Sequence, residues 1–378
     1  MRIVLAICIV LGMICFPSVT IVHGEASAPE VSADAAILMD AKTGRILYAK
    51  QADKSMKIAS LTKIMTAIVA IEQGKLTERV TVKPDAVGVE GSSIYLKQGE
   101  KIPLETLLYG LMLRSGNDAA VAIAEHIGGS VEGFVYLMNE KATQLGLTQT
   151  HFVNPHGLDH PKHYSSAKDL AVLTSYALKN PVFRRIVKTE VKEVPWPGET
   201  WRRTFYNKNK FLRLYKGADG VKTGFTKQSG RTLVTSATRK GKQLICVTLN
   251  DPNDWEDHRR LYEYGFSHYR LRSVLKKGEV VLAPFQQEKK RRDLTIVADA
   301  TFQYPLSKHE KEKIVLKPML TYPPHLLQQA DVHVGSVQIY LDQKRIGSVP
   351  LISKWRPTTS VWSSWKRVFV SLLLQGES

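Results

Sequence analysis

The sequence predicts a mixed α/β protein with a larger first domain, a smaller β-rich second domain and an amphipathic helix at its C-terminal end. Three observations predict this arrangement. Strand-like runs and apolar helical patterns are interspersed up to about residue 271, short segments of alternating polarity follow from 272 to 357, and residues 361–374 present one apolar face at helical spacing. A chain of 378 residues can bury a full core and form more than one domain.

Residues 1–24 have the composition of a secretory signal peptide. Arg2 precedes an apolar run over residues 3–16, and Val22–Gly24 places small residues where a signal peptidase cleaves. The apolar run is too short to cross a membrane as a helix. We therefore expect an exported protein that is cleaved after Gly24.

The first domain, expected over residues 25–271, begins with a hairpin and a helix. Strand-like apolar runs at 36–39 and 45–48 flank a turn that contains glycine. Helix formers and apolar residues then occupy positions 61–73 without interruption, and Gly74 stands where a C-cap glycine is expected.

The rest of this domain is predicted from periodicity and turn residues. Residues 80–99 contain three glycines and form a turn-rich connection, after which the helical period returns. The next helices are expected at 104–113, 118–127, 131–145 and 167–179. Strand-like runs are expected at about 187–195, 231–238 and 243–249, and a closing helix at 254–270.

The second domain, residues 272–357, is expected to consist of short strands. Its alternating apolar positions are Leu294, Ile296 and Ala298, then Ile314 and Leu316, then Val337, Ile339 and Leu341. Gly335 indicates a bulge in the last of these strands. Nothing in this domain resembles a reaction centre.

The C-terminal segment, residues 358–378, is expected to form an amphipathic helix. The residues of its apolar face are Val361, Trp362, Trp365, Val368, Phe369, Leu372 and Leu373. Lys366 and Arg367 interrupt the segment, so we expect the helix to lie in a membrane interface rather than to cross the membrane. Docking on the second domain is the alternative, but the terminal position and the paired tryptophans favour the membrane.

The chain is basic, with 53 Lys and Arg against 35 Asp and Glu and a formal net charge of +18. In an exported protein this charge favours anionic polymers or anionic lipid head groups as partners. Nucleic acid is not an expected partner, because the one concentrated basic run is Lys289–Arg292 and no nucleic-acid motif accompanies it. Cys246 is the one cysteine left after cleavage and is expected to be buried. The 11 histidines lack zinc-ligand spacing, so no metal site is expected.

Ser60 is the first candidate catalytic residue. It falls at or just inside a helix N-terminus, and Lys63 lies three residues later on the same helical face. A serine hydroxyl is a weak nucleophile until a base removes its proton, and a partly desolvated lysine amine can do this. The spacing alone is not specific, because a helix cap explains Ser60 equally well and the same spacing recurs at Ser165 and Lys168.

A polar interruption, Arg114–Asp118, joins two helices of the first domain. Such a turn can present the Ser115 hydroxyl and the Asn117 amide to a cleft while the flanking helices hold them rigidly. A plain helix-to-helix turn in which Asn117 or Asp118 caps the next helix is the alternative, and both roles are compatible.

A third polar segment, Asp219–Thr226, is extended and contains two glycines, so its backbone can approach a ligand closely. Lys222 adds a positive charge to it and Thr223 a hydroxyl. Other polar candidates are weaker. His156 lies in a loop whose composition favours a hydrogen-bonded loop histidine, and His126 lies at the end of a helical pattern.

The three segments together resemble a known family. Ser60–Lys63, Ser115–Asn117 and Lys222–Gly224 follow one another about 50 and then 100 residues apart, as in penicillin-binding proteins and class A β-lactamases. With the longer strings at 58–67, 113–120 and 154–158, the chain resembles the low-molecular-mass penicillin-binding proteins, which are serine-type D-alanyl-D-alanine carboxypeptidases, from about residue 32 to the tail. The run at 250–255 resembles the sporulation-type carboxypeptidase of Bacillus-like bacteria. A similar triplet at Lys42–Gly44 precedes the serine and does not fit the order.

The resemblance implies the penicillin-binding, β-lactamase-like transpeptidase fold, a central antiparallel sheet flanked by helices. It implies that Ser60 attacks the bond between the two terminal D-alanines of a peptidoglycan stem pentapeptide, with Lys63 as general base and Ser115 as proton relay. Asn117 would hold the substrate amide. The carboxylate would bind Lys222 and Thr223 beside Gly224, and the backbone N–H groups of Ser60 and Phe225 would form the oxyanion hole.

The resemblance also implies partners and a location. β-Lactam antibiotics would acylate Ser60 as covalent inhibitors, and no cofactor is required. The terminal helix would attach the exported enzyme peripherally to the anionic outer face of the cytoplasmic membrane, next to the cell wall, or to a membrane surrounding the forespore. A role in spore cortex or cell-wall maturation is implied.

The sequence departs from the pattern of the family at two positions, and three other functions are alternatives to the carboxypeptidase. Phe225 stands where some relatives carry histidine, and the carboxylate-binding arginine of some relatives has no obvious counterpart, with Asn250 near its position. A β-lactamase is one alternative, although the Glu-x-x-Leu-Asn string that supplies its deacylation base is missing from the sequence. An endopeptidase that cuts crosslinks and a non-catalytic wall-binding or penicillin-sensing module are the others.

Overall fold

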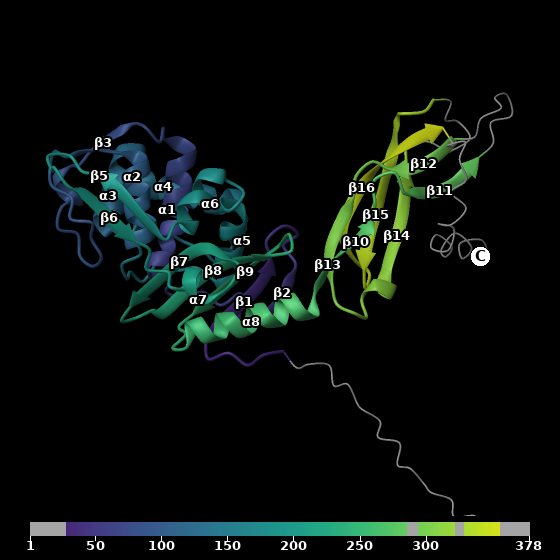
Figure 1. Ribbon diagram of the computed structural model, residues 1–378, viewed down its shortest axis with the longest axis horizontal. Coiled ribbons are helices and arrows are strands. Elements are labelled where there is room, and N and C mark those ends of the chain that lie inside the picture. Colours follow the sequence, from purple (N-terminus) through teal and green to yellow (C-terminus); the bar gives the residue numbers. More distant parts are fainter. Residues whose placement is uncertain (1–27, 286–293, 322–328, 356–378) are drawn as a thin grey trace, which may run out of the picture.

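The computed structural model describes residues 28–285, 294–321 and 329–355 (Figure 1). The predicted signal peptide, the basic run at 289–292 and the predicted terminal helix lie outside these residues. The described chain forms a larger part with helices around a central sheet and a smaller part built of strands (Figure 1). The predicted α/β fold class with a C-terminal β domain is thereby confirmed. Within the described ranges, no helix has both the length and the apolar character that a membrane span requires.

Five antiparallel strands form the central sheet, in the spatial order β2-β1-β9-β8-β7. β1 (Ala35–Asp40) and β2 (Ile46–Lys50) are the predicted hairpin, and β1 also pairs with β9 (Lys242–Leu249). β8 (Gly230–Arg239) lies between β9 and β7 (Ala218–Thr226). Strands from both ends of the domain therefore meet in one sheet, and β7 is left at its edge.

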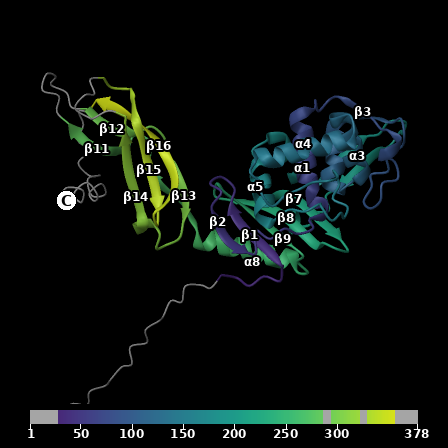
Figure 2. The same cartoon turned by 180° about the vertical axis from the view of Figure 1, so that it is seen from behind.

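Helices cover both faces of this sheet (Figures 1 and 2). Neighbouring residues of β1 point to opposite faces, so Ile37 contributes to the core under α1 and Leu38 to the core under α8. The helices on the α1 side include α1 (Lys63–Gln73), α5 (Ala167–Ala177) and α6 (Pro181–Lys188), and the long helix α8 spans Asp254–His268. The alternation thus explains why both Ile37 and Leu38 are fully buried.

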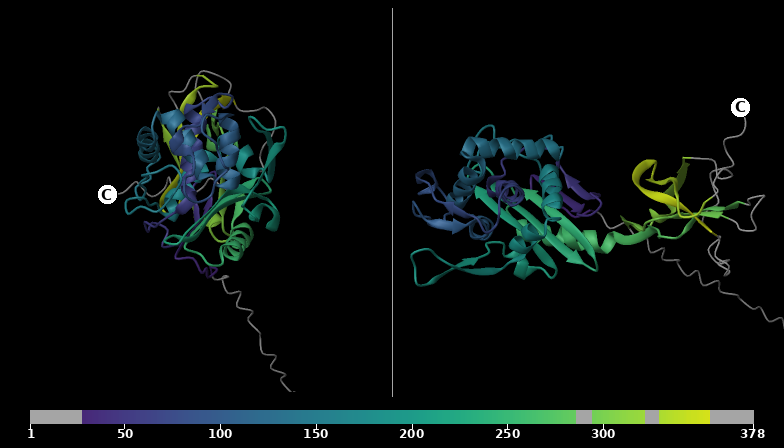
Figure 3. Two further views of the ribbon diagram at one scale, coloured as in Figure 1. Left: turned by 90° about the vertical axis from the view of Figure 1, so that its left-hand side faces the viewer. Right: turned by 90° about the horizontal axis from the view of Figure 1, so that it is seen from above.

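Most of the remaining helices and two short hairpins lie toward the end of the molecule remote from the second domain, whereas α7 (Phe211–Leu214) packs against α8 (Figure 1). The helical elements are η1 (Ala59–Thr62), η2 (Pro84–Ala86), α2 (Leu104–Tyr109), the π-helical turn η3 (Gly110–Arg114), α3 (Asn117–Gly128), α4 (Val131–Gln144) and α7 (Phe211–Leu214). The hairpins are β3 (Arg79–Thr81) with β4 (Lys101–Pro103), and β5 (Val191–Pro195) with β6 (Arg202–Tyr206). The β5–β6 hairpin projects from the body (Figure 3).

The second domain is a five-stranded antiparallel sheet with a separate two-stranded ladder. The order of the larger sheet is β11-β12-β16-β15-β14, and the ladder joins β10 to β13. The strands are β10 (Arg270–Leu275), β11 (Val280–Phe285), β12 (Leu294–Ala298), β13 (Phe302–Leu306), β14 (Ile314–Leu320), β15 (His333–Leu341) and β16 (Lys344–Trp355), with a short helical turn η4 (Lys311–Lys313). The register of β15 shifts at Gly335, where a bulge was predicted.

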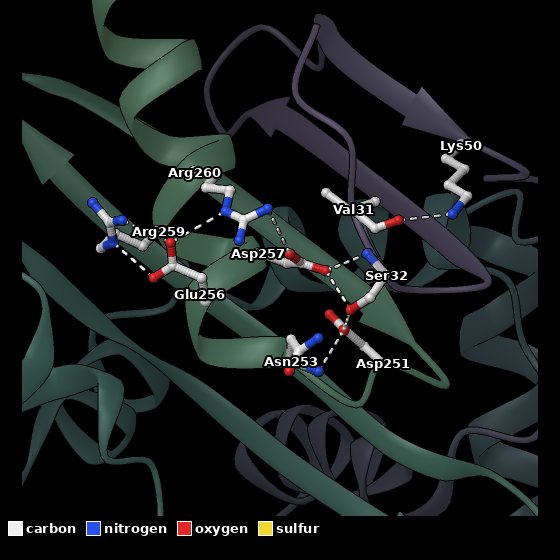
Figure 4. A network of polar contacts seen from close by, with 9 residues as sticks. All are labelled: Val31, Ser32, Lys50, Asp251, Asn253, Glu256, Asp257, Arg259 and Arg260. Atoms are coloured by element: carbon white, nitrogen blue, oxygen red, sulfur yellow. Dashed lines mark hydrogen bonds and ion pairs between the residues drawn. The ribbon is translucent and has the colours of Figure 1, made fainter.

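Two buried carboxylates hold the segment that precedes β1 (Figure 4). The Ser32 N–H donates to Asp257 Oδ2 at 2.5 Å, and the Ser32 hydroxyl lies 2.7 Å from Asp251 Oδ1 and 2.8 Å from Asp257 Oδ2. Burial raises the pKa of Asp251. These hydrogen bonds tie the segment to α8.

Several local predictions are wrong or incomplete. The strand predicted from residue 187 begins at Val191, because α6 occupies the preceding residues. The helix predicted at 104–113 is interrupted by the π-helical turn η3. Gly74 does end α1, but its φ of −104° is an ordinary one. A Cβ atom at Gly74 would lie 2.5 Å from Leu104 Cδ2, so close packing and not a left-handed cap requires this glycine.

Candidate active site

Ser60 lies in the 3-10 turn η1 that leads into α1, and its hydroxyl does not cap the helix. The preceding residue, Ala59, has a φ of +47°, which is uncommon for a residue with a Cβ atom. Lys63 Nζ lies 3.0 Å from Ser60 Oγ, as their spacing of three residues on one helical face predicts. The turn therefore aims the serine hydroxyl at a lysine amine.

Lys63 is fully buried and has two further hydrogen-bond partners. Its Nζ lies 2.7 Å from Asn117 Oδ1 and 2.6 Å from the His156 carbonyl oxygen, and both of these oxygens can only accept. A neutral amine has two N–H groups for them and a lone pair for the Ser60 hydroxyl. Burial, and next the charge of Lys222, hold the pKa of Lys63 well below its usual value, so the neutral form is favoured.

Ser115 and Asn117 lie where the sequence predicts a turn between two helices, and both are buried. Ser115 has a φ of +64° and places its Oγ 3.1 Å from Lys222 Nζ. The Asn117 amide donates from Nδ2 to the Glu90 carbonyl oxygen at 2.5 Å, which fixes its Oδ1 toward Lys63. The predicted helix-capping roles are not seen: Gly116 is the N-cap of α3, which has no side-chain cap hydrogen bond.

Lys222 lies on the edge strand β7, with Nζ donating to the Thr223 carbonyl oxygen at 2.7 Å. Burial, and next the charge of Lys208, lower its pKa to about 7. A Cβ atom at Gly224 would lie 3.0 Å from the Ser60 backbone nitrogen and 2.5 Å from Thr232 Oγ1. The glycine therefore lets β7 run directly beside the turn that carries Ser60.

The side chain of Phe225 is 67% exposed, so the residue that replaces the histidine of some relatives projects into solvent. Asn250, near the position of the missing arginine, donates from Nδ2 to Asp34 Oδ2 at 2.9 Å. Arg231 on β8 pairs in register with Phe225 on β7, but its guanidinium forms a bidentate pair with Asp254. Nothing among these described contacts replaces the arginine.

Sequence reasoning missed a buried histidine behind the nucleophile. The Val153 N–H donates to His163 Nδ1 at 3.2 Å, so the ring proton is on Nε2 and is donated to Thr62 Oγ1 at 2.8 Å. Thr62 in turn donates to the Ala59 carbonyl oxygen at 2.8 Å. Burial lowers the pKa of His163 to about 3, so this chain of bonds stays neutral and ends at the residue before Ser60.

Sequence reasoning also missed Lys208, which donates from Nζ to Ser92 Oγ at 2.8 Å and lowers the pKa of both site lysines. The ring of His156, which was weighed as a catalytic group, is largely buried, and burial lowers its pKa to about 3. Its contribution to the site is its backbone carbonyl, which faces Lys63. No sequence motif marks a contact of that kind.

The residues that repeat the motif spacings have other partners. Lys168 pairs with Asp53, and Ser165 Oγ lies 2.8 Å from Thr150 Oγ1. Thr43, in the triplet near the N-terminus, donates to Asp40 in a hairpin turn. Of the two occurrences of each pattern, only the one that fits the required order lies at the site around Ser60.

Comparison with known proteins agrees with this geometry. Residues 23–253 match the model of the family described as D-alanyl-D-alanine carboxypeptidase, and residues 269–355 match that of the penicillin-binding protein 5 C-terminal domain. The chain is 31% identical over 337 residues to the D-alanyl-D-alanine carboxypeptidase DacF of Bacillus subtilis, covering 85% of each protein. It is 33% identical over 345 residues to DacC of Escherichia coli, covering 86% of this chain and 84% of the relative.

Solved structures show the same likeness. Penicillin-binding protein 5 of Haemophilus influenzae superposes with a TM-score of 0.70 at 30% identity, covering 86% of this chain and 98% of that one. Penicillin-binding protein 6B of Escherichia coli gives a TM-score of 0.67 at 31% identity, with 86% and 96% covered. The first of the two family models spans more than half of the sequence, and the chain belongs to the D-alanyl-D-alanine carboxypeptidase family.

Proposed function

We propose that this serine peptidase removes the terminal D-alanine from peptidoglycan stem pentapeptides, with Ser60 as nucleophile and Lys63 as general base. One observation carries the assignment: Lys63 Nζ lies 3.0 Å from Ser60 Oγ. The other two partners of this amine, Asn117 Oδ1 and the His156 carbonyl oxygen, can only accept hydrogen bonds. Lys63 takes the Ser60 proton while Oγ attacks the carbonyl carbon of the penultimate D-alanine. The product of this step is an acyl-enzyme, which water then hydrolyses.

Two backbone N–H groups are proposed to stabilise the oxyanion of the tetrahedral intermediate. They belong to Ser60 and Phe225, and the proposal is supported by the close approach of β7 to the Ser60 nitrogen at Gly224. Removing one donor of an oxyanion hole commonly costs about 3–4 kcal/mol of transition-state stabilisation. Because both donors are backbone groups, the exposed Phe225 side chain is not required for this step.

Ser115 and Lys222 are proposed to return a proton to the leaving amine. Lys222 Nζ donates to the Ser115 hydroxyl at 3.1 Å and orients it, and the proton that Ser115 gives to D-alanine is replaced by the one that Lys63 took from Ser60, so Lys222 keeps its charge. Asn117 holds the substrate amide, and Lys222 with Thr223 binds the terminal carboxylate. A β-lactam acylates Ser60 in the same way, but its leaving group stays tethered and the adduct persists.

The cellular setting is a further part of the proposal and rests on sequence patterns. We propose that residues 1–24 direct export, that the domains divide at about residue 272, and that residues 358–378 attach the enzyme to the anionic outer face of the cytoplasmic membrane or of a forespore membrane. Maturation of cell wall or spore cortex is the corresponding role. Fractionation of cells that express the full chain, with and without residues 358–378, tests the attachment.

Mass spectrometry of the protein after incubation with a labelled penicillin tests the site assignment. The expected result is one adduct per chain on the peptide that contains Ser60, long-lived on the time scale of substrate turnover, together with D-alanine release from a pentapeptide. Ser60→Ala should abolish both. Rapid turnover of the penicillin would indicate a β-lactamase, an adduct without D-alanine release would indicate a sensor, and release by Ser60→Ala would overturn the assignment.

A further inference from the structure

Tyr95 is presented to solvent by a rigid piece of backbone. Its side chain is 78% exposed, the highest value of any large hydrophobic residue in the described ranges, whereas Ile94 and Leu96 on either side are buried. Its φ of +61° is unfavourable for a tyrosine, and the fold has to maintain it. The side chain of the buried Asp118 does so by accepting the N–H groups of Ile94 and Leu96 at 3.0–3.1 Å.

Trp201 extends from the β5–β6 hairpin beside this segment. Trp201 directly precedes β6, and Arg203, two residues later, turns toward the body of the domain, where its guanidinium reaches the backbone of the Tyr95 segment. The Arg203 guanidinium stacks 3.7 Å from the centre of the Trp196 ring and 5.7 Å from that of Trp201, and it donates to the Ile94 carbonyl oxygen at 2.5 Å. Trp201 itself is 53% exposed, whereas Trp196 and Arg203 beside it are held by the contacts just described.

The segment that carries Tyr95 is bonded to the turn that carries Ser115 and Asn117, and Arg203 links the same segment to Trp201. The Asn117 N–H donates to the Ser92 carbonyl oxygen at 2.6 Å, only three residues before Tyr95. Asp118, which holds the Tyr95 segment, follows Asn117 directly in the chain. The segment and the catalytic turn are therefore parts of one rigid unit, and whatever lies over Tyr95 lies next to the cleft.

We propose that Tyr95 and Trp201 form a docking surface for sugar rings of the glycan strand that carries the stem peptide. This proposal rests on the proposed function and specifies its substrate as polymeric peptidoglycan. A stem peptide is covalently attached to its glycan, so a stem that enters the cleft brings sugar rings to the rim. Tyrosine and tryptophan suit them because each offers an apolar face together with a polar edge at little cost in conformational entropy.

Size and position favour a glycan over other partners. The two partly exposed rings can cover roughly 200–300 Å², well below the roughly 800 Å² per partner of a stable protein interface. The β5–β6 hairpin, whose connecting loop contains Trp201, lies at the end of the molecule opposite the C-terminal β domain (Figure 1). A membrane bound near the C-terminal end would therefore not reach it.

Paired substrates test the proposal with the full chain. Tyr95→Asn removes the ring but keeps a residue that tolerates φ > 0, and Trp201→Gln removes the second ring at the hairpin tip. Each variant is expected to release D-alanine from isolated pentapeptide-rich peptidoglycan roughly fivefold to tenfold more slowly, while its kcat/KM for diacetyl-lysyl-D-alanyl-D-alanine stays within about twofold of the unchanged chain. Tyr136→Asn, at a tyrosine on α4 that is 65% exposed, is the matched control and should affect neither substrate.

Competition identifies the bound part of the polymer. Glycan strands freed of peptide should inhibit the reaction on peptidoglycan by the unchanged chain and should not inhibit the reaction on the soluble peptide. Equal losses on both substrates, unchanged rates on peptidoglycan, or an altered oligomeric state in Tyr95→Asn and Trp201→Gln would each overturn the proposal. Absence of activity on the soluble peptide in the unchanged chain would instead contradict the proposed function.

Discussion

Lys63 and Lys222 are two buried amines whose neighbours give them different tasks. Lys63 faces two acceptors and a hydroxyl and serves as a base only when neutral. Lys222 faces the Ser115 hydroxyl, and in the proposed mechanism its charge binds the substrate carboxylate. Its pKa of about 7 lies far below that of a free lysine because burial disfavours the ammonium form. Lys63 is neutral while Lys222 is charged only within a limited pH range.

The acylation rate should therefore depend on pH in a bell shape. It is expected to rise as Lys63 loses its proton, since the pKa of Lys63 is well below the usual value, and to fall through about pH 7 as Lys222 loses its proton. Lys222→Arg keeps its charge at every accessible pH, so the falling limb should move to more alkaline pH. The second-order rate constant of acylation by a fluorescent penicillin measures this. If the acylation rate fell at the same pH in Lys222→Arg and in the unchanged protein, the titration of Lys222 would not be the cause of the fall.

His163 illustrates how a residue without contact to the reacting atoms can position them. Its Nε2–H holds Thr62, which holds the Ala59 carbonyl in the turn before Ser60. His163→Phe keeps the ring volume but removes the donor to Thr62 Oγ1 and the acceptor of the Val153 N–H. Leaving a buried polar group without its partner commonly costs about 1–3 kcal/mol. We expect kcat for D-alanine release to fall roughly tenfold with KM little changed.

His163→Gln is the matched variant, because its amide can donate to Thr62 from a similar distance. It should recover most of kcat at the same thermal stability. If both variants lost activity in proportion to their loss of stability, His163 would be a packing residue and not a positioning one.

At the scale of elements, α1 shows how a helix end can be set by packing. Gly74 ends the helix in an ordinary backbone conformation, and a Cβ atom there would lie 2.5 Å from Leu104 Cδ2 and 2.6 Å from Ile127 Cδ1. Gly74→Ala should therefore destabilise the protein by about 1–3 kcal/mol, as overpacking commonly does. Thermal unfolding measures the loss.

Adding Ile127→Val to Gly74→Ala removes one of the two clashing methyl groups, so the double variant should regain part of the lost stability although Ile127→Val alone removes packing. Additive losses in the double variant would show that backbone conformation, and not the close approach, requires the glycine.

The elements also show which structure could be predicted from the sequence. The elements that were predicted contribute either a continuous apolar run or a regular apolar face to the core, and they are the hairpin at the N-terminal end, α1, α3 to α5, β8, β9 and α8. β5 and β6 form a hairpin that projects into solvent, so burial imposes no alternation on Arg202–Tyr206. α6 was missed although Asn180 and Pro181 form a standard helix start, since its short apolar stretch also fits a strand.

The candidate site also contains features that the sequence could predict and features that it could not. The structure brings together five residues of the predicted motifs, and the sequence could indicate them because their proposed roles depend on side-chain identity: Ser60, Lys63, Ser115, Asn117 and Lys222. The motifs could not predict the His156 carbonyl or the conformation of Ala59, since backbone groups leave no trace in residue identity. His163 and Lys208 act through neighbours that only the tertiary fold supplies.

At the scale of the whole molecule, one arginine joins the two domains. Arg45, in the turn between β1 and β2, lies between the rings of Tyr269 and Tyr304, 5.1 and 5.2 Å from their centres. It also donates to the Pro305 carbonyl oxygen and pairs with Glu310, and its side chain is only 12% exposed. A buried guanidinium with this many partners is a stronger link than a surface ion pair.

Arg45→Ala should separate the domains without changing the active site. Heating is expected to change from one unfolding transition to two, because each domain has its own core and the link between them is lost. Small-angle scattering should show a larger radius of gyration, while acylation of Ser60 by penicillin stays within about twofold of the original rate. Arg45→Lys keeps the charge but cannot stack flat between two rings or bind bidentately, so it should behave like the alanine variant. A single transition at an unchanged temperature in both variants would show that the β10–β13 connection alone holds the domains together.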